Sequence, residues 1–218
     1  MRCLQPPLPT VHRDPAARST AMFSLIYGFW KLFFRKAEFQ VLILGVDRAG
    51  KTTLLEQLKG IYTGLDPLPP GKIPPTVGLN IGRMQVSRSK LIFWDLGGTT
   101  ALRSLWENYY SEAHGLVFVV DGSDHDRLEE ARETLMGLLN HPDLAAIPLL
   151  LFANKQDVDG AVSPRELEAR FSLQQLCSSS QPHNVLGTTA LNGEGVQEGV
   201  EWLVEALKTS PRAMGMQQ

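Results

Sequence analysis

The pattern G-x-x-x-x-G-K-[ST] at residues 45–52, GVDRAGKT, is the feature that most constrains how this chain can fold. It directly follows an apolar run of strand length at residues 39–44 and leads into a helical pattern from Lys51 onward. A strand, a glycine turn and a helix N-terminus in this order surround an anion with backbone N–H groups. We therefore interpret the segment as a phosphate-binding loop of an α/β domain, in preference to a glycine turn that merely caps a helix.

Two side chains at the end of this loop have the chemistry that phosphate binding needs. Lys51 is expected to reach the β- and γ-phosphates, and the hydroxyl of Thr52 is expected to bind Mg²⁺. Arg48 is an unusual long cation at its position. We interpret it as a solvated side chain that points away, and the alternative is an arginine that acts on the phosphates in cis. The expected nucleotide contacts of this segment are Gly45, Asp47, Arg48, Ala49, Gly50, Lys51, Thr52 and Thr53.

A second motif, Asp95-Leu96-Gly97-Gly98, follows the buried-strand pattern of residues 91–94. The carboxylate of Asp95 can hold a metal-bound water opposite Thr52. Gly98 has no side chain, so its backbone N–H can approach a terminal phosphate closely. Aspartate and glycine after a strand are also ordinary turn residues, and the distance behind a phosphate-binding loop is what favours the functional interpretation.

A third motif, NKQD at residues 154–157, selects the base. It follows an apolar run and is expected at the carboxyl end of a buried strand, where open α/β sheets bind ligands. The ionised carboxylate of Asp157 accepts hydrogen bonds only, so it suits the N–H and NH₂ edge of guanine and argues against an ATP-dependent P-loop kinase. Lys155 can lie along the purine face, and the N–H of Ala190 can reach the guanine oxygen. The alternatives are an ordinary turn residue for Asn154 and a packing residue for Ala190.

These motifs, together with their surroundings, resemble the Arf and Arf-like family of small GTPases. The resemblance lies in LGVD at residues 44–47, TVGLN at 76–80, WDLGG at 94–98 and LWENYY at 105–110, and it extends from Met22 to about Lys208. It implies a P-loop NTPase fold, with a six-stranded mostly parallel sheet and helices on both faces. It also implies a switch that cycles between GDP and GTP, with Mg²⁺ as cofactor.

The same resemblance assigns roles to the two segments that respond to the nucleotide. Thr76 in switch one is expected to bind Mg²⁺ when the γ-phosphate is present, and Gly98 in switch two is expected to sense that phosphate. Leu79, Trp94 and Tyr109 match the exposed hydrophobic triad by which the family contacts effectors, with Leu79 in place of the usual phenylalanine. Core packing is the alternative interpretation of the two aromatic residues.

One residue departs from the family pattern at the expected catalytic position. Thr99 stands where the family generally carries the glutamine that orients the attacking water. A threonine hydroxyl can hydrogen-bond water, but the side chain is short and stiff at χ1. We expect slow GTP hydrolysis, and the alternative is a GTP-binding scaffold with little or no hydrolytic activity.

Partners and location are implied by the resemblance and not by residue chemistry. They are a guanine-nucleotide exchange factor, a GAP and effector proteins, met in the cytoplasm and reversibly on Golgi and trans-Golgi membranes during vesicle traffic. The net charge of −2 and the lack of a long basic block argue against nucleic acid as a partner.

The chain is expected to divide into a disordered extension at 1–21, an amphipathic helix at 22–37, a GTP-binding domain at 38–208 and a flexible tail at 209–218. Apolar residues recur at helical spacing through 22–36, which predicts peripheral membrane contact, and a helix packed on its own domain is the alternative. Translation from Met22 is an alternative start, because the resemblance begins there.

Apolar runs and helical patterns alternate along residues 38–208, as expected for a parallel sheet covered on both faces. Strands are expected at 39–45, 77–87, 90–95, 115–121, 147–153 and 184–190, the second and third forming a hairpin. Helices are expected at 50–60, 100–110, 126–140, 163–170 and 195–208, the fourth with a capping box at its start.

Overall fold

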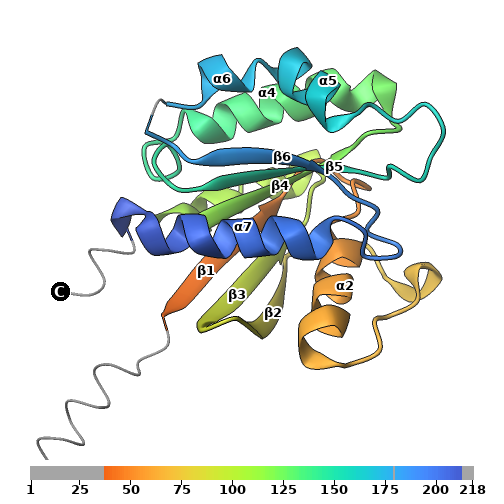
Figure 1. Cartoon of the computed structure of the whole chain (residues 1–218). Coiled ribbons are helices and arrows are strands. Elements are labelled where there is room, and N and C mark those ends of the chain that lie inside the picture. Colours follow the sequence, from red (N-terminus) through yellow and green to blue (C-terminus); the bar gives the residue numbers. More distant parts are fainter. Residues whose placement is uncertain (1–36, 179, 213–218) are drawn as a thin grey trace, which may run out of the picture. The chain divides into compact units, whose positions relative to one another are not determined.

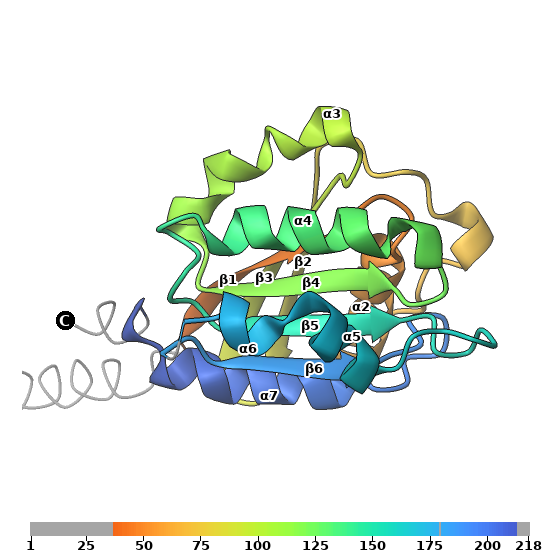
Figure 2. The same cartoon turned by 90° about the horizontal axis from the view of Figure 1, so that it is seen from above.

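The computed structural model describes residues 37–178 and 180–212, and these form a six-stranded sheet with helices on both faces (Figures 1 and 2). The strands are β1 Glu38–Leu44, β2 Leu79–Val86, β3 Ser89–Leu96, β4 Gly115–Asp121, β5 Leu149–Asn154 and β6 His183–Gly187. Their order is β2-β3-β1-β4-β5-β6, in which β2 and β3 pair antiparallel and the other neighbours pair parallel. The predicted fold class and the predicted hairpin are confirmed.

Helices connect the strands and cover the sheet from two sides. They are α2 Lys51–Thr63, α3 Thr100–Arg103, α4 Leu128–Leu139, α5 Pro164–Phe171, α6 Leu173–Leu176 and α7 Val196–Thr209, with 3-10 helices η1 Pro70–Lys72, η2 Trp106–Glu112 and η3 His125–Arg127. α2 and α7 contact each other on one face, and α4 lies on the opposite face (Figure 2). The capping box at the start of α5 is confirmed, because Ser163 and Glu166 exchange both of its hydrogen bonds.

The central strands explain why the sheet can hold a site at one edge. All residues of β4 and β5 are buried, which matches their continuous apolar sequences. α7 packs closely on β5, since a Cβ added at Gly199 would lie 2.5 Å from the ring of Phe152. Because the strands other than β2 run parallel, the loops that follow β1, β3, β5 and β6 meet at their shared carboxyl edge.

The prediction of one continuous helix at residues 100–110 is wrong. Four residues of α3 are followed by a turn and then by the 3-10 helix η2. The indole of Trp106 is buried and donates to the carbonyl of Gly97 at 2.9 Å, so a contact with switch two determines the path here. The short helix α6 was not predicted. It is separated from α5 by Ser172 at φ 52°, a conformation that serine does not signal in a sequence.

The ends of the domain differ in part from expectation. The extension at 1–21 and residues 22–36 of the expected amphipathic helix lie outside the described residues. The predicted start of the flexible tail at residue 209 is too early. Thr209 is the last residue of α7, and Arg212 donates to the carbonyl of Tyr110 at 3.2 Å and to the carbonyl of Ala113. Within the described part of the chain, no helix combines the length and the apolar character needed to cross a membrane.

Candidate nucleotide-binding site

Lys51, the first residue of α2, directs its ammonium group into the loop that follows β1, where the group is almost enclosed. Its Nζ donates to the carbonyls of Gly45 at 3.0 Å and Val46 at 2.8 Å, and the residue is 6% exposed. Burial lowers the pKa of Lys51 to about 8, although the charges of Asp95 and Asp47 act in the opposite direction. A buried ammonium bonded to neutral carbonyls favours an anion beside it, as a phosphate-binding loop requires.

Two glycines give the loop its shape, and neither position has room for a side chain. Gly45 and Gly50 have φ values of 143° and 97°. A Cβ on Gly45 would lie 2.2 Å from the carbonyl oxygen of Val119, and one on Gly50 would lie 2.3 Å from Nδ2 of Asn154. Helix α2 begins directly after Gly50, so the free N–H groups of its first turn open onto the loop.

Asp95, near the end of β3, meets two threonine hydroxyls that come from distant segments. Its Oδ2 accepts from Oγ1 of Thr52 at 2.7 Å and from Oγ1 of Thr76 at 3.4 Å, and the two hydroxyls are 2.7 Å apart. Its Oδ1 is buried and has no hydrogen-bond partner among the described residues. Burial raises the pKa of Asp95, against the hydrogen bond from Thr52 and the charge of Lys51.

This arrangement is compatible with a divalent cation. A carboxylate oxygen without a partner, next to two hydroxyl oxygens, is the hard donor set that Mg²⁺ prefers. The described residues contain no group of three or more His, Cys, Asp or Glu side chains that would form a metal site of the all-protein kind. The hydroxyls of Thr52 and Thr76, both expected to bind Mg²⁺, lie next to each other, and the ion itself stays a prediction.

Gly98 of switch two lies directly against the phosphate-binding loop. A Cβ at this position would be 2.4 Å from Nζ of Lys51, 2.5 Å from the carbonyl oxygen of Gly45 and 2.7 Å from the backbone nitrogen of Asp47. Thr99, the next residue, is exposed and precedes α3, and its hydroxyl makes no capping hydrogen bond. The predicted phosphate sensor is thus beside the loop, and the predicted catalytic residue is an exposed residue next to it.

Asn154 ties the phosphate-binding loop to the segment after β6. Its Nδ2 donates to the carbonyl of Ala49 at 2.8 Å. Its Oδ1 accepts from the N–H of Ala190 at 3.0 Å and from the hydroxyl of Thr188 at 3.3 Å. This is more than an ordinary turn residue provides. The N–H that was predicted to reach guanine is engaged here by Asn154.

The base-selecting segment is held by an ion pair whose carboxylate partner is buried. Nζ of Lys155 lies 2.5 Å from Oδ2 of Asp121, whose side chain is 7% exposed and whose Oδ1 accepts from the hydroxyl of Ser123 at 2.6 Å. Burial alone would raise the pKa of Asp121, but the hydrogen bonds from Lys155 and Ser123 outweigh it and hold the pKa below its usual value. Asp157 is exposed, so its carboxylate is open to a ligand.

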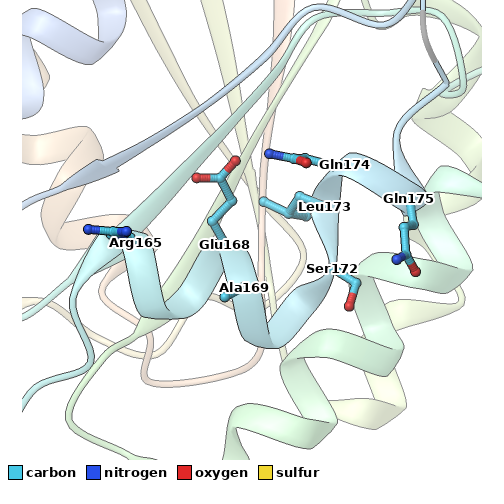
Figure 3. A pocket seen from close by; sticks show the side chains of 7 residues that line it. All are labelled: Arg165, Glu168, Ala169, Ser172, Leu173, Gln174 and Gln175. Atoms are coloured by element: carbon cyan, nitrogen blue, oxygen red, sulfur yellow. The ribbon is translucent and has the colours of Figure 1, made fainter.

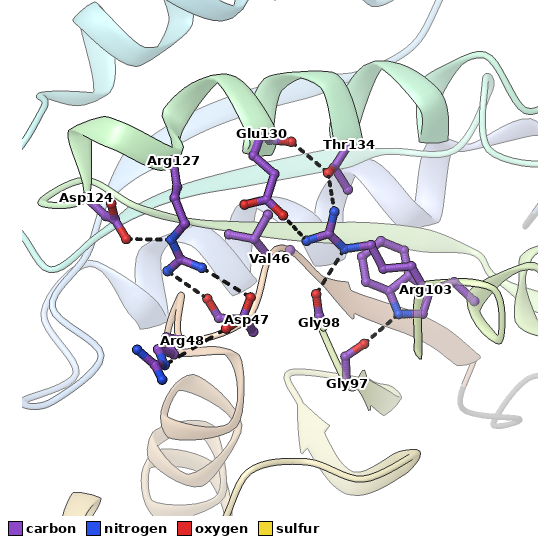
Figure 4. A network of polar contacts seen from close by, with 12 residues as sticks. Val46, Asp47, Arg48, Gly97, Gly98, Arg103, Asp124, Arg127, Glu130 and Thr134 are labelled. Atoms are coloured by element: carbon purple, nitrogen blue, oxygen red, sulfur yellow. Dashed lines mark hydrogen bonds and ion pairs between the residues drawn. The ribbon is translucent and has the colours of Figure 1, made fainter. Parts of the chain in front are cut away.

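Arg127, the last residue of η3, contacts the phosphate-binding loop at Asp47, and the sequence did not indicate this role (Figure 4). Its guanidinium donates to the side chain and to the carbonyl of Asp47, both at 3.1 Å, and to Asp124 at 2.7 Å. Asp124 and Arg127 are three residues apart, so a local charge pair between them could have been predicted from the sequence. The contact with Asp47 joins residues 80 positions apart, and no local pattern indicates it. Arg48 agrees with the solvated interpretation, since its side chain is 86% exposed.

The three residues of the predicted effector surface lie together beside the switches. The rings of Trp94 and Tyr109 meet edge to face with centroids 5.6 Å apart. Leu79 and Ile81 are two residues apart in β2, so their side chains lie on the same face of the sheet. Ile81 pairs with Trp94 of β3 and is 37% exposed. The members of the triad are half-buried against the core, so packing and an exposed apolar surface coexist here.

A separate hollow of about 380 Å³ lies along α5 and α6 (Figure 3). Its lining includes Arg165, Glu168 and Gln175, and it contains none of the predicted site residues. We assign it no part in nucleotide binding.

Known proteins with the same pattern include both sequences and a solved structure. The sequence profile of the ADP-ribosylation factor family (Arf) matches residues 25–207. ADP-ribosylation factor-related protein 1 of Rattus norvegicus is 41% identical over 187 residues, with 85% of this chain and 93% of that protein covered. ADP-ribosylation factor-like protein 3 of Saccharomyces cerevisiae is 38% identical over 197 residues, covering 88% and 97%. The structure of the Arl6 BBS3 small GTPase from Trypanosoma brucei, with bound nucleotide analogue GppNp, is 35% identical with a TM-score of 0.69, covering 79% of this chain and 98% of that chain.

Proposed function

Because this chain belongs to the ADP-ribosylation factor family of small GTPases, we propose that it is a molecular switch that alternates between a GDP-bound and a GTP-bound state. One observation carries the proposal: both switch segments meet the phosphate-binding loop. Thr76 contacts Thr52 and Asp95, and Gly98 lies against Lys51. Segments placed in this way are held by a γ-phosphate and are released when hydrolysis removes it.

The phosphate contacts follow from the positions of the donors. Lys51 and the N–H groups of its loop bind the β- and γ-phosphates, and the N–H of Gly98 binds the γ-phosphate. Mg²⁺ would be held by Thr52 and Thr76, with Asp95 holding a metal-bound water, and it would neutralise negative charge on the phosphates. Thr76 and Gly98 therefore recognise the group by which GTP differs from GDP.

Guanine is selected at the carboxyl end of β5. The exposed carboxylate of Asp157 accepts from the N–H and NH₂ groups of guanine, and Lys155, oriented by Asp121, lies along the purine face. A contact between the N–H of Ala190 and the guanine oxygen requires that this N–H be shared with Asn154.

We propose that hydrolysis is slow and that a GAP accelerates it. Thr99 replaces the usual glutamine, and its exposed β-branched side chain reaches less far toward an attacking water. A scaffold that binds GTP without hydrolysing it is the second candidate function, and the same residue supports it.

Location and partners complete the proposal. The half-buried triad Leu79, Trp94 and Tyr109, next to both switches, is the proposed contact for effectors. A guanine-nucleotide exchange factor and a GAP are the proposed regulators, as is general for the family. The proposed site of action is the Golgi and trans-Golgi membrane, reached through residues 22–36, whose apolar residues recur at helical spacing.

The test is direct binding of fluorescent GDP and of a non-hydrolysable GTP analogue to the purified full chain in the presence of Mg²⁺. Saturable binding of both, with ATP unable to compete, is expected. Replacing Asp157 with Asn removes an acceptor and adds a donor, so we expect weaker guanine binding and a gain for xanthine nucleotides. Absence of saturable guanine-nucleotide binding by the wild-type chain would refute the proposed function.

A further inference from the structure

Arg103, the last residue of α3, connects switch two to helix α4 (Figure 4). Its Nε donates to the carbonyl of Gly98 at 3.0 Å. One terminal nitrogen donates to the hydroxyl of Thr134 at 3.1 Å, and the other donates to a carboxylate oxygen of Glu130. One guanidinium group thus binds the phosphate sensor and two side chains of helix α4. We call Arg103, Glu130 and Thr134 the switch clasp.

Both peptide groups that flank Gly98 are held by side chains of the same segment. The carbonyl of Gly97 accepts from the indole of Trp106 at 2.9 Å, and the carbonyl of Gly98 accepts from Arg103. In a trans peptide the C=O and the following N–H point in opposite directions. The Trp106 contact therefore orients the N–H of Gly98, and the Arg103 contact orients the next peptide group and limits rotation about Gly98.

The α4 partners are arranged to receive the guanidinium group. Glu130 and Thr134 are one helical turn apart and therefore share a face of α4. The hydroxyl of Thr134 donates to the carbonyl of Glu130 at 2.7 Å, which leaves its lone pairs for Arg103. The Arg103 side chain is 19% exposed and that of Glu130 is 38% exposed, so the charge-assisted bond is partly shielded from water.

We propose that the switch clasp is a positioning device that favours the triphosphate-bound state, with Glu130 and Thr134 acting on Gly98 through Arg103. The inference rests on the proposed function, in which Gly98 binds the γ-phosphate. Coupling between two sites is reciprocal, so a γ-phosphate that holds Gly98 in place also stabilises the clasp. Helix α4 thereby becomes a second surface whose contacts depend on the nucleotide.

The experiment compares the dissociation constants of GDP and of a non-hydrolysable GTP analogue, with Mg²⁺, for the full chain and its variants. We expect Arg103→Ala to weaken analogue binding about tenfold while GDP binding changes little, as the loss of a charge-assisted hydrogen bond predicts. Glu130→Gln and Thr134→Val act through the same group, so each has a smaller effect in the same direction. Arg103→Ala combined with Glu130→Gln is expected to equal Arg103→Ala alone.

Arg132→Ala is the matched control. It breaks the ion pair of Arg132 with Glu129 on α4, 2.6 Å long, without touching switch two, and it should leave the ratio of the two dissociation constants unchanged. If Arg103→Ala does not fold, Glu130→Gln and Thr134→Val decide the question on the same ratio. Equal weakening of both nucleotides, or additive effects of Arg103 and Glu130, would overturn the switch clasp. A wild-type chain that binds neither nucleotide would instead overturn the proposed function.

Discussion

A single methyl group at Gly98 is expected to separate binding of GTP from binding of GDP. In Gly98→Ala the new Cβ would lie 2.5 Å from the carbonyl oxygen of Gly45 and 2.7 Å from the backbone nitrogen of Asp47, where ordinary contacts begin at 3.4 Å. Lys51 can move its flexible end, but these two backbone atoms cannot move without deforming the loop. Switch two must therefore retreat by roughly 1 Å, which lengthens a hydrogen bond from the N–H of Gly98 to the γ-phosphate beyond its useful range.

The size of the effect follows from the bond that is lost. A hydrogen bond to a charged group contributes about 1.5–3 kcal/mol, so the affinity for a non-hydrolysable GTP analogue should fall about 10- to 150-fold. GDP has no γ-phosphate and should bind nearly as before. Titration of fluorescent nucleotides into the purified chain with Mg²⁺ measures both constants.

Gly137→Ala serves as the control for this substitution. Gly137 lies within α4 on its solvent-exposed side, and an added Cβ would meet nothing within 4 Å. The variant should bind both nucleotides like the wild type and should be more stable by about 1 kcal/mol, because alanine favours helix. A wild-type ratio of the two nucleotide affinities in Gly98→Ala would refute the placement of Gly98 at the γ-phosphate.

Three further outcomes are expected. Thr99→Gln should hydrolyse GTP faster than the wild type in single-turnover assays, because glutamine reaches the attacking water; equal rates would contradict a role for Thr99 in slowing the reaction. Arg127→Ala removes two hydrogen bonds to Asp47 and should weaken GDP and the GTP analogue alike by about three- to fivefold, in contrast to the switch clasp. Asp121 has a lowered pKa in the folded chain, so its contribution to stability is present above the unfolded pKa of about 3.9 and is lost as the pH falls through the lower folded value. Urea unfolding should accordingly show wild type more stable than Asp121→Asn by a constant margin between pH 5 and 7 that shrinks below about pH 4; a margin that does not change with pH would argue against an ionised Asp121.

Several parts of this protein were predictable from local sequence, and the reasons are physical. The central strands were recognisable because β4 and β5 are buried on both faces and carry continuous apolar runs. The capping box of α5 was recognisable because its hydrogen bonds join residues three apart. The family resemblance was confirmed because its motifs are contiguous stretches around the loop and the switches.

Other parts of the structure could not be predicted from local sequence patterns. The break between α3 and η2 depends on the contact of Trp106 with Gly97, which a helical pattern does not reveal. Ser172 adopts a left-handed conformation that serine rarely signals, and α6 was missed for this reason. Asn154 was interpretable as a turn residue, and its bonds to Ala49 and Ala190 join segments more than 30 residues away.

The chain by itself determined which chemical groups are present and their order along the sequence: an ammonium, two hydroxyls, a carboxylate and a base-selecting aspartate. Tertiary structure decided which of them meet and what holds them. Arg103 reaches α4 across 31 residues to Thr134, and Arg127 reaches Asp47 across 80, because the packing of α4 against the sheet brings these side chains together. Such contacts depend on the direction of side chains between separate elements, and no spacing along the sequence encodes that direction.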